Sequence, residues 1–224
     1  MSIVIQQRAY SDEQKNQRRS VILSAAEKLF KLKQYDDVTM VDIATLSAVS
    51  KGTLYVYFRT KDEIFLVYAK QEIDLFFGRL QGYLTAQSEP SGVKGVIKAL
   101  GSAYAESQYM IRLLAVLHRV LESKLGFDNV LDFRRKLIPL LEVTGTECER
   151  HLCFLKKGEG KRLLLTIHGI SLGLQQLADP TDVMQQVELQ PDMAVYRFEF
   201  QSTLLSTVDL LLAGMEVRSK QSTN

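Results

Sequence analysis

A run of residues near position 50 contains the hydroxyl, amino and glycine groups that bind phosphates and base edges. The run reads Ser50-Lys51-Gly52-Thr53-Leu54-Tyr55-Val56-Tyr57-Phe58. Lysine and the free amides of a helix N-terminus bind phosphate oxygens, hydroxyls donate to phosphates or base edges, and glycine lets the backbone come close. The candidate DNA-binding residues come from this run and its flanks: Thr39, Ser50, Lys51, Gly52, Thr53, Tyr55, Tyr57 and Lys61.

The elements that must position this run are helices with clear capping signals. Thr39 is followed three positions later by Asp42, which predicts a short helix ending at Ser47. Ser50 is the N-cap of a second short helix, and Thr60 caps a long helix from Lys61 to about residue 86. Leu54 and Phe58 are four residues apart and are predicted to point into a small core.

A longer helix precedes these elements. It is predicted to begin at Ser11 and to place apolar side chains at helical spacing on one face, namely Ile22, Ala25, Ala26, Leu29 and Phe30. A long helix followed by two short ones joined through residues 48–50 is the helix-turn-helix arrangement, whose last helix enters the major groove of DNA. The sequence therefore predicts DNA binding by the N-terminal part of the chain.

The net charge of the 224-residue chain is only +2, but the positive charge is concentrated near the N-terminus. Residues 1–62 hold ten basic and seven acidic residues, a net of +3, whereas residues 63–224 hold 18 basic and 19 acidic residues, a net of −1. A hydrophobic content of 46%, with four prolines and thirteen glycines, indicates a globular protein and excludes disordered and collagen-like chains. No apolar run approaches the ~20 residues of a membrane span or forms a signal-peptide core, so a cytoplasmic location is expected.

Cysteine and histidine are too sparse to indicate a disulfide framework or a zinc site. Cys148 and Cys153 are predicted to be reduced core thiols. The three histidines, His118, His151 and His168, are scattered and lack close cysteine or histidine neighbours. No metal and no cofactor are expected.

The rest of the chain is also predicted to be helical, which gives an all-α fold of about nine helices. Helices are expected at 92–106, 108–124, 128–157 and 161–178, with a break at 158–160 and a last helix from Pro191 to Met215. The segment 196–200 alternates like a strand, but apolar residues continue from Phe200 at helical spacing, which favours a helix.

The N-terminal motifs resemble those of the TetR family of bacterial transcriptional regulators. The resemblance is carried by Val38-Thr39-Met40-Val41-Asp42-Ile43-Ala44, Val49-Ser50-Lys51-Gly52-Thr53-Leu54-Tyr55, Tyr57-Phe58 and Lys61-Asp62-Glu63, and it covers residues 20–66 densely. The chain departs from many members at Ala48 and Gln34, where they have glycine; Ala48 is expected to be tolerated, and Gln34 to need a left-handed conformation at some cost. Val41 stands where some members have a base-reading arginine.

This resemblance implies a DNA-binding domain at residues 1–66 and a ligand-binding and dimerisation domain at 67–224. It implies a repressor that binds a palindromic DNA operator as a homodimer and is released by a small-molecule effector. Residues 161–178 are apolar on more than one face, as expected for a helix that packs on a partner subunit. Four residues of the middle helices are candidates for an effector pocket of largely hydrophobic character: Tyr104, His118, Phe133 and His168.

Two other functions compete with this one. An enzyme would need a phosphate loop, nucleophile elbow or metal motif, and none is present; Glu147 and His151 share helical spacing but lack further ligands or a base. A DNA-bound scaffold or partner-binding protein of the same fold, without a small-molecule switch, remains the alternative.

Overall fold

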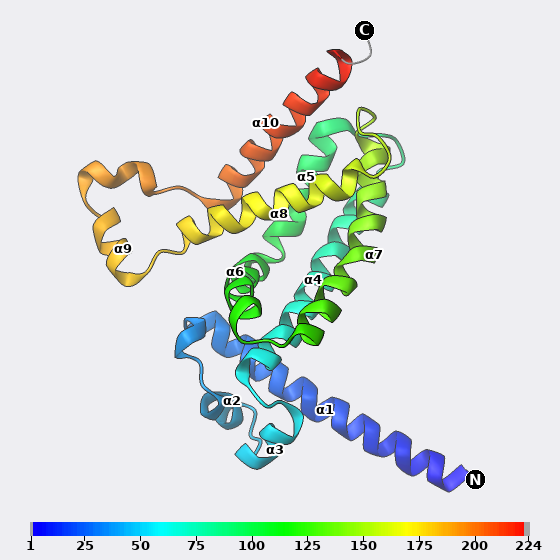
Figure 1. Cartoon of the computed structure of the whole chain (residues 1–224), viewed down its shortest axis with the longest axis vertical. Coiled ribbons are helices and arrows are strands. Elements are labelled where there is room, and N and C mark those ends of the chain that lie inside the picture. Colours follow the sequence, from blue (N-terminus) through cyan, green and yellow to red (C-terminus); the bar gives the residue numbers. More distant parts are fainter. Residues whose placement is uncertain (1, 222–224) are drawn as a thin grey trace. The chain divides into compact units, whose positions relative to one another are not determined.

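The computed structural model describes the backbone of residues 2–221 and the side chains of residues 13–118 and 124–221. Within these residues all regular structure is helical, which confirms the predicted all-α class (Figure 1). Ten α-helices and two short 3-10 helices are present where about nine helices were expected. No helix among the described residues has the length and apolar character needed to cross a membrane.

From the N-terminus to the C-terminus, the helices are α1 (Ser2–Leu32), η1 (Tyr35–Asp37), α2 (Met40–Leu46), α3 (Lys51–Tyr57), α4 (Lys61–Thr85), α5 (Gly92–Ala105), α6 (Gln108–Ser123), α7 (Phe127–His151), α8 (Glu159–Ala178), α9 (Asp182–Glu188), η2 (Pro191–Tyr196) and α10 (Phe200–Gln221). The chain forms two compact units. The first consists of the residues up to Gln71 with Arg119–Leu125, and the second of Glu72–His118 with the residues from Gly126 onward.

The first unit is built around an aromatic cluster. Phe65 of α4 contacts Phe30 of α1 at 5.6 Å and Tyr35 of η1 at 5.0 Å between ring centroids. Tyr68 lies one turn further along α4 and meets the edge of Phe30. All four rings are buried, so α1, η1 and α4 share one core. Helix α1 itself begins at Ser2 rather than at the predicted Ser11.

The predicted helix starts at Thr39, Ser50 and Thr60 are confirmed. Thr39 forms a capping box with Asp42, and the Ser50 hydroxyl accepts the Thr53 N–H at 3.1 Å. The Thr60 hydroxyl accepts the Glu63 N–H at 3.2 Å. These bonds satisfy amide groups that have no partner within a helix.

The left-handed backbone conformation that was predicted at Gln34 occurs instead at Ala48, in the turn between α2 and α3. Gln34 is extended (φ −66°, ψ 150°), so it needs no left-handed conformation. Ala48, which was expected to be easily tolerated, adopts a left-handed φ of 53° instead. A side chain in this region crowds the following carbonyl, which costs roughly 1–2 kcal/mol. The prediction for Gln34 was therefore wrong, and Ala48, whose tolerance stays a prediction, is the residue with the left-handed conformation.

Two glycines allow the backbones of α7 and α8 to touch in the second unit. A Cβ on Gly145 would lie 2.6 Å from the backbone nitrogen of Lys161, and one on Gly160 would lie 2.0 Å from the carbonyl oxygen of Gly145. Both obstacles are backbone atoms, which cannot rotate away. This crossing fixes the position of the first turn of α8 on α7.

Helices α7 and α10 end or begin at other residues than predicted, because a glutamate carboxylate binds backbone N–H groups nearby. Helix α7 ends at His151 rather than 157, because the Glu149 carboxylate accepts the N–H groups of Gly158 and Gly160 and folds the connection back. Helix α10 begins at Phe200 rather than Pro191, because the Glu199 carboxylate accepts the first N–H groups of α10. Helix α9 and the 3-10 helix η2 occupy the segment between α8 and α10.

Alanine at position 145 tests the α7–α8 crossing. We expect Gly145→Ala to lower the free energy of unfolding by about 1–3 kcal/mol or more, because the new methyl group has no space. Gly82→Ala is the matched control: a Cβ at this exposed position of α4 meets nothing within 4 Å, so a gain of about 0.5–1 kcal/mol is expected. Denaturant unfolding of both variants measures the difference. Equal effects would show that the crossing is not tight.

Candidate nucleic-acid interface and interior polar site

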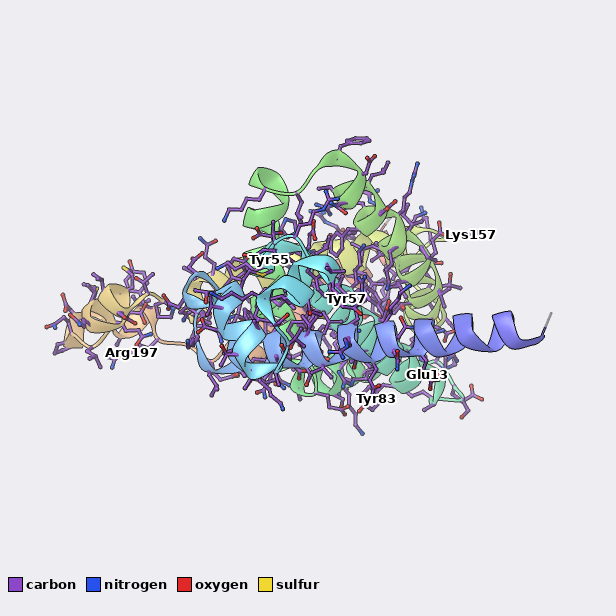
Figure 2. All side chains as sticks on the ribbon, turned by 90° about the horizontal axis from the view of Figure 1, so that it is seen from below. Glu13, Tyr55, Tyr57, Tyr83, Lys157 and Arg197 are labelled. Carbon is purple, nitrogen blue, oxygen red and sulfur yellow. The ribbon has the colours of Figure 1, made fainter. Side chains whose placement is uncertain are left out.

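Helix α3 presents most of the predicted DNA-binding residues on one short segment. Lys51, Gly52 and Tyr55 are exposed, and Thr53 and Tyr57 are partly exposed. Figure 2 shows Tyr55 and Tyr57 on this helix. Leu54 and the following Phe58 are buried, as predicted. The buried pair anchors α3 and leaves its other side chains facing solvent.

The N-terminal end of α3 is held by its own hydroxyl groups. The Ser50 and Thr53 side-chain oxygens lie 2.8 Å apart and share a hydrogen bond. A Cβ on Gly52 would meet no atom within 4 Å, so the backbone at this position is open to a close approach. No acidic residue lies in the first turn of α3, and Lys51 supplies a positive charge there. Hydroxyl groups, a lysine and bare backbone therefore lie together at one end of the helix.

Val56 is an exposed residue of α3 that sequence reasoning missed. Its side chain is 82% exposed, more than that of Tyr55 at 53%. It lies four residues after Gly52 and three after Thr53, and this spacing could have placed it on their face. An apolar side chain in this position suits contact with a thymine methyl group.

Thr39 lies at the start of α2, and its hydroxyl is engaged within the protein. It donates to the Asp42 carboxylate at 2.8 Å and accepts the Asp42 N–H at 3.1 Å. Hydrogen bonds from Thr39 lower the pKa of Asp42 and keep its carboxylate charged. A phosphate would meet this negative charge beside Thr39, so phosphate contact by Thr39 stays a prediction.

Lys61 makes hydrogen bonds that sequence reasoning did not foresee. Its ammonium donates to the carbonyl oxygens of Tyr35 at 2.8 Å, Val38 at 2.9 Å and Asp36 at 3.3 Å. It also lies 4.4 Å from the centre of the Tyr35 ring, and burial lowers its pKa. An ammonium group has three N–H donors, so a phosphate would have to displace a carbonyl. The structure does not test the phosphate contact predicted for Lys61. Because these bonds use all three donors, we expect Lys61 to hold η1 on α4 rather than to bind a phosphate.

The salt dependence of DNA binding separates these two roles. We expect Lys61→Ala to destabilise the first unit by about 1–2 kcal/mol through lost hydrogen bonds, and to leave the slope of log Kd against log salt unchanged. Lys51→Ala, at an exposed position, is expected to reduce that slope by about 0.9 for each Lys51 that contacts a phosphate, and so by about 1.8 for a bound dimer. Fluorescence anisotropy with a labelled duplex at several salt concentrations measures both. A reduced slope for Lys61→Ala would instead assign it a phosphate.

Two partly buried histidines of the second unit lie side by side. Nε2 of His118 on α6 lies 3.4 Å from Nε2 of His168 on α8. One turn further along α8, the Ser171 hydroxyl donates to the His168 carbonyl at 2.8 Å. Tyr104 is buried against Phe76 and Phe200, and burial raises its pKa to about 12. Of the four predicted pocket residues, the structure thus brings His118 and His168 together, while Tyr104 is buried on α5 and Phe133 on α7.

The histidine pair predicts a specific pH dependence of stability. Burial, followed by the charges of His118 and Arg134, lowers the pKa of His168 from 6.5 to about 4. Between pH 6.5 and 4 the unfolded chain therefore binds a proton that the folded chain rejects, so the free energy of unfolding falls as the pH drops through this window. In the His168→Gln variant we expect the free energy of unfolding to fall less with decreasing pH, by up to about 3 kcal/mol. Urea unfolding of both proteins at pH 7 and pH 4.5 measures the difference; identical pH dependences would refute this assignment.

His151 and Glu147, the two residues considered for an enzymatic site, form contacts that hold helices together. His151 is buried, accepts the Ser91 N–H at Nδ1 and lies 3.0 Å from the Leu84 carbonyl through Nε2, so it joins the end of α7 to α4 and α5. Glu147 is paired with Arg150. Among the described side chains, no three histidine, cysteine, aspartate or glutamate residues are grouped to hold a metal ion.

The two cysteines differ from each other, which corrects the prediction of two core thiols. Cys148 is buried, and burial raises the pKa of its thiol to about 12. Cys153 is exposed, because it follows the end of α7 at His151. Both thiols are free.

Comparison with known proteins relates both units to one group of regulators. Residues 22–68 match bacterial regulatory proteins of the tetR family, and residues 70–219 match the tetracyclin repressor-like C-terminal domain. The chain is 40% identical over 60 residues to the HTH-type transcriptional regulator HbdR of Aromatoleum sp. (strain CIB), and 40% identical over 53 residues to the uncharacterized HTH-type transcriptional regulator YfiR of Bacillus subtilis (strain 168). These matches cover 27% and 24% of this chain and about a quarter (26%) of each relative.

Solved structures resemble nearly the whole chain at low identity. FadR of Thermus thermophilus, a TetR-family repressor solved with lauroyl-CoA, is 18% identical with a TM-score of 0.54, and the match covers 87% of this chain and 93% of FadR. A TetR-family regulator from Syntrophomonas wolfei is 18% identical with a TM-score of 0.57, covering 91% and 96% of the two chains. At this identity the likeness shows a common fold.

Proposed function

The chain belongs to the TetR family of bacterial transcriptional regulators, and we propose that it is a repressor that binds a palindromic operator as a homodimer. The exposed surface of α3 is the observation that carries the DNA-binding part of this proposal. Ser50, Lys51, Gly52, Thr53, Tyr55 and Tyr57 belong to this surface, and we add Val56 as an apolar base contact. Lys51 and the tyrosine hydroxyls supply phosphate contacts, whereas Thr53 and Val56 face base edges.

Exposed apolar side chains on the last two long helices support a homodimer. Leu165 and Leu177 of α8 and Leu210 and Val217 of α10 are all about half or more exposed. Two-fold pairing of these helices would bury them in a four-helix interface. Such a dimer presents two α3 helices, which accounts for a palindromic operator. The domain boundary that we propose lies after residue 66, with dimerisation by residues 67–224.

A small hydrophobic effector is proposed to release the repressor from DNA. Tyr104 and the His118–His168 pair offer a few polar groups among apolar side chains of the second unit, which is the composition of a ligand site. Helix α4 runs unbroken from the first unit into the second, so a shift of α4 on effector binding would change the separation of the two α3 helices. Lauroyl-CoA, found in Thermus thermophilus FadR, is a suitable first probe of the effector class.

The experiment that tests this function is selection of DNA from a random pool, followed by release of the selected duplex with candidate effectors. We expect a palindromic sequence and dissociation by a hydrophobic compound. A selected sequence that no compound in a broad screen releases would favour a scaffold without a small-molecule switch.

Thr53→Ala tests sequence recognition by α3. We expect it to weaken binding to the selected operator by about 1–3 kcal/mol while binding to random duplex changes little, because Thr53 is assigned to base edges. Thr45→Ala, an exposed threonine of α2 whose hydroxyl is bonded to the Val41 carbonyl, is the matched control. Equal losses on operator and random DNA would contradict a role of Thr53 in specificity.

A further inference from the structure

The segment between α8 and α10, which we name the arm (residues 179–199), exposes an unusual number of apolar side chains. Neither α9 nor η2 contains a buried residue. Figure 1 shows α9 beyond the C-terminal end of α8, away from the other long helices of the second unit, and Figure 2 shows Arg197 on the same projection. The exposed apolar residues of the arm are Val183, Met184, Val187, Leu189, Val195 and Tyr196. Exposed clusters of this kind mark interaction surfaces.

The arm is a folded element with defined attachments. Asp179 at its base forms an ion pair with Arg112 of α6 at 3.2 Å. Thr181 caps α9, and α9 packs on η2. Glu199 caps α10 at the other end. The apolar side chains are therefore presented on a structured projection.

A groove lies at the opposite end of the same two helices. It has a volume of about 220 Å³ and lies between the first two turns of α8 and the second half of α10. Its walls are formed by Glu159, Arg162, Leu163, Thr166, Leu211 and Met215. Helix α8 has 20 residues and is about 30 Å long, so the arm of a subunit is too far from its own groove to fill it.

In a two-fold symmetric dimer, the arm of one subunit can lie close to the groove of the other. Rotation about an axis perpendicular to α8 reverses the helix, so the C-terminal end of α8 in one subunit lies beside the N-terminal end of α8 in its partner. We propose that the arm of each subunit docks in the α8–α10 groove of the other, so that two equivalent contacts close the dimer. This inference rests on the homodimer proposed above and assigns it a second contact surface.

The charges of the two surfaces are complementary. The arm contains five acidic residues against the single basic Arg197, and three of them, Asp182, Glu188 and Asp192, lie on α9 and η2. The groove itself is lined by Arg162 and Glu159, and its surroundings hold Lys161, Arg218 and Lys220. Lys161 pairs with Glu142 and Lys220 with Glu216, so the seven charged residues at this end sum to a net charge of +1, against −2 for Asp182, Glu188, Asp192 and Arg197 of the arm. Opposite charges orient an apolar contact and disfavour arm-to-arm pairing, which would bring like charges together. A second copy of this chain is thus the occupant that the groove fits.

An inter-subunit disulfide tests the contact directly. In a Cys153→Ser background, we expect the double variant Leu189→Cys/Met215→Cys to form covalent dimers under mild oxidation, seen by non-reducing electrophoresis. Cys148 does not interfere, because it is buried with a raised thiol pKa. The single variants Leu189→Cys and Met215→Cys are the controls and are expected to remain uncrosslinked, since each offers only one of the two surfaces.

Light scattering separates failure of the arm contact from failure of the proposed dimer. A dimer in solution without a disulfide in the double variant would overturn the arm contact and leave the homodimer standing, whereas a monomer would overturn both. Leu189→Ser provides a second measurement: Leu189 is 73% exposed, so its loss should leave the melting temperature of the isolated subunit unchanged. We expect the dimer Kd to rise roughly a hundredfold, because two equivalent sites each lose about tenfold. An unchanged Kd would contradict the proposal.

Discussion

The DNA-binding unit depends on the contact of the first two turns of α4 with the connection between α1 and α2. Phe65 contacts Phe30 and Tyr35, while Lys61 lies over the Tyr35 ring and donates to three carbonyl groups of the same connection. Helices α2 and α3 have seven residues each, too few to be stable alone. Their positions are therefore set by their packing on α1 and α4.

The hydrogen bonds of the second unit constrain the effector that we propose. No buried side-chain nitrogen or oxygen among the described residues lacks a hydrogen-bond partner. A ligand that binds between His118 and His168 must replace the contact between their Nε2 atoms. Such a site favours ligands with a matching polar group and rejects purely hydrocarbon molecules of the same size. The tight α7–α8 crossing at Gly145 and Gly160 limits how far α8 can yield during this exchange.

The starts of α2, α3 and α4 could be predicted from residues close together in the sequence. The features that were not predicted depend on contacts between residues far apart in the sequence. The caps at Thr39, Ser50 and Thr60 involve residues three positions apart, so the sequence reveals them. The partners of Lys61 lie 23–26 residues away, and no spacing rule points to them. The fold-back of residues 152–158 could not be predicted either. The arm was not predicted because its apolar residues do not recur at helical spacing. The recognition helix was predicted with its exposed face, except Val56.

The backbone conformation of Ala48 limits which residues can replace it. Its left-handed φ of 53° lies between the two helices that hold the DNA-binding surface. Glycine, asparagine and aspartate accept this conformation, whereas β-branched residues are excluded from it. A complete substitution scan would therefore show a narrow spectrum at an exposed position, where tolerance is normally broad. The exchanges that this backbone conformation allows keep the turn between α2 and α3 unchanged, so this position is constrained by its φ angle and not by any side-chain contact.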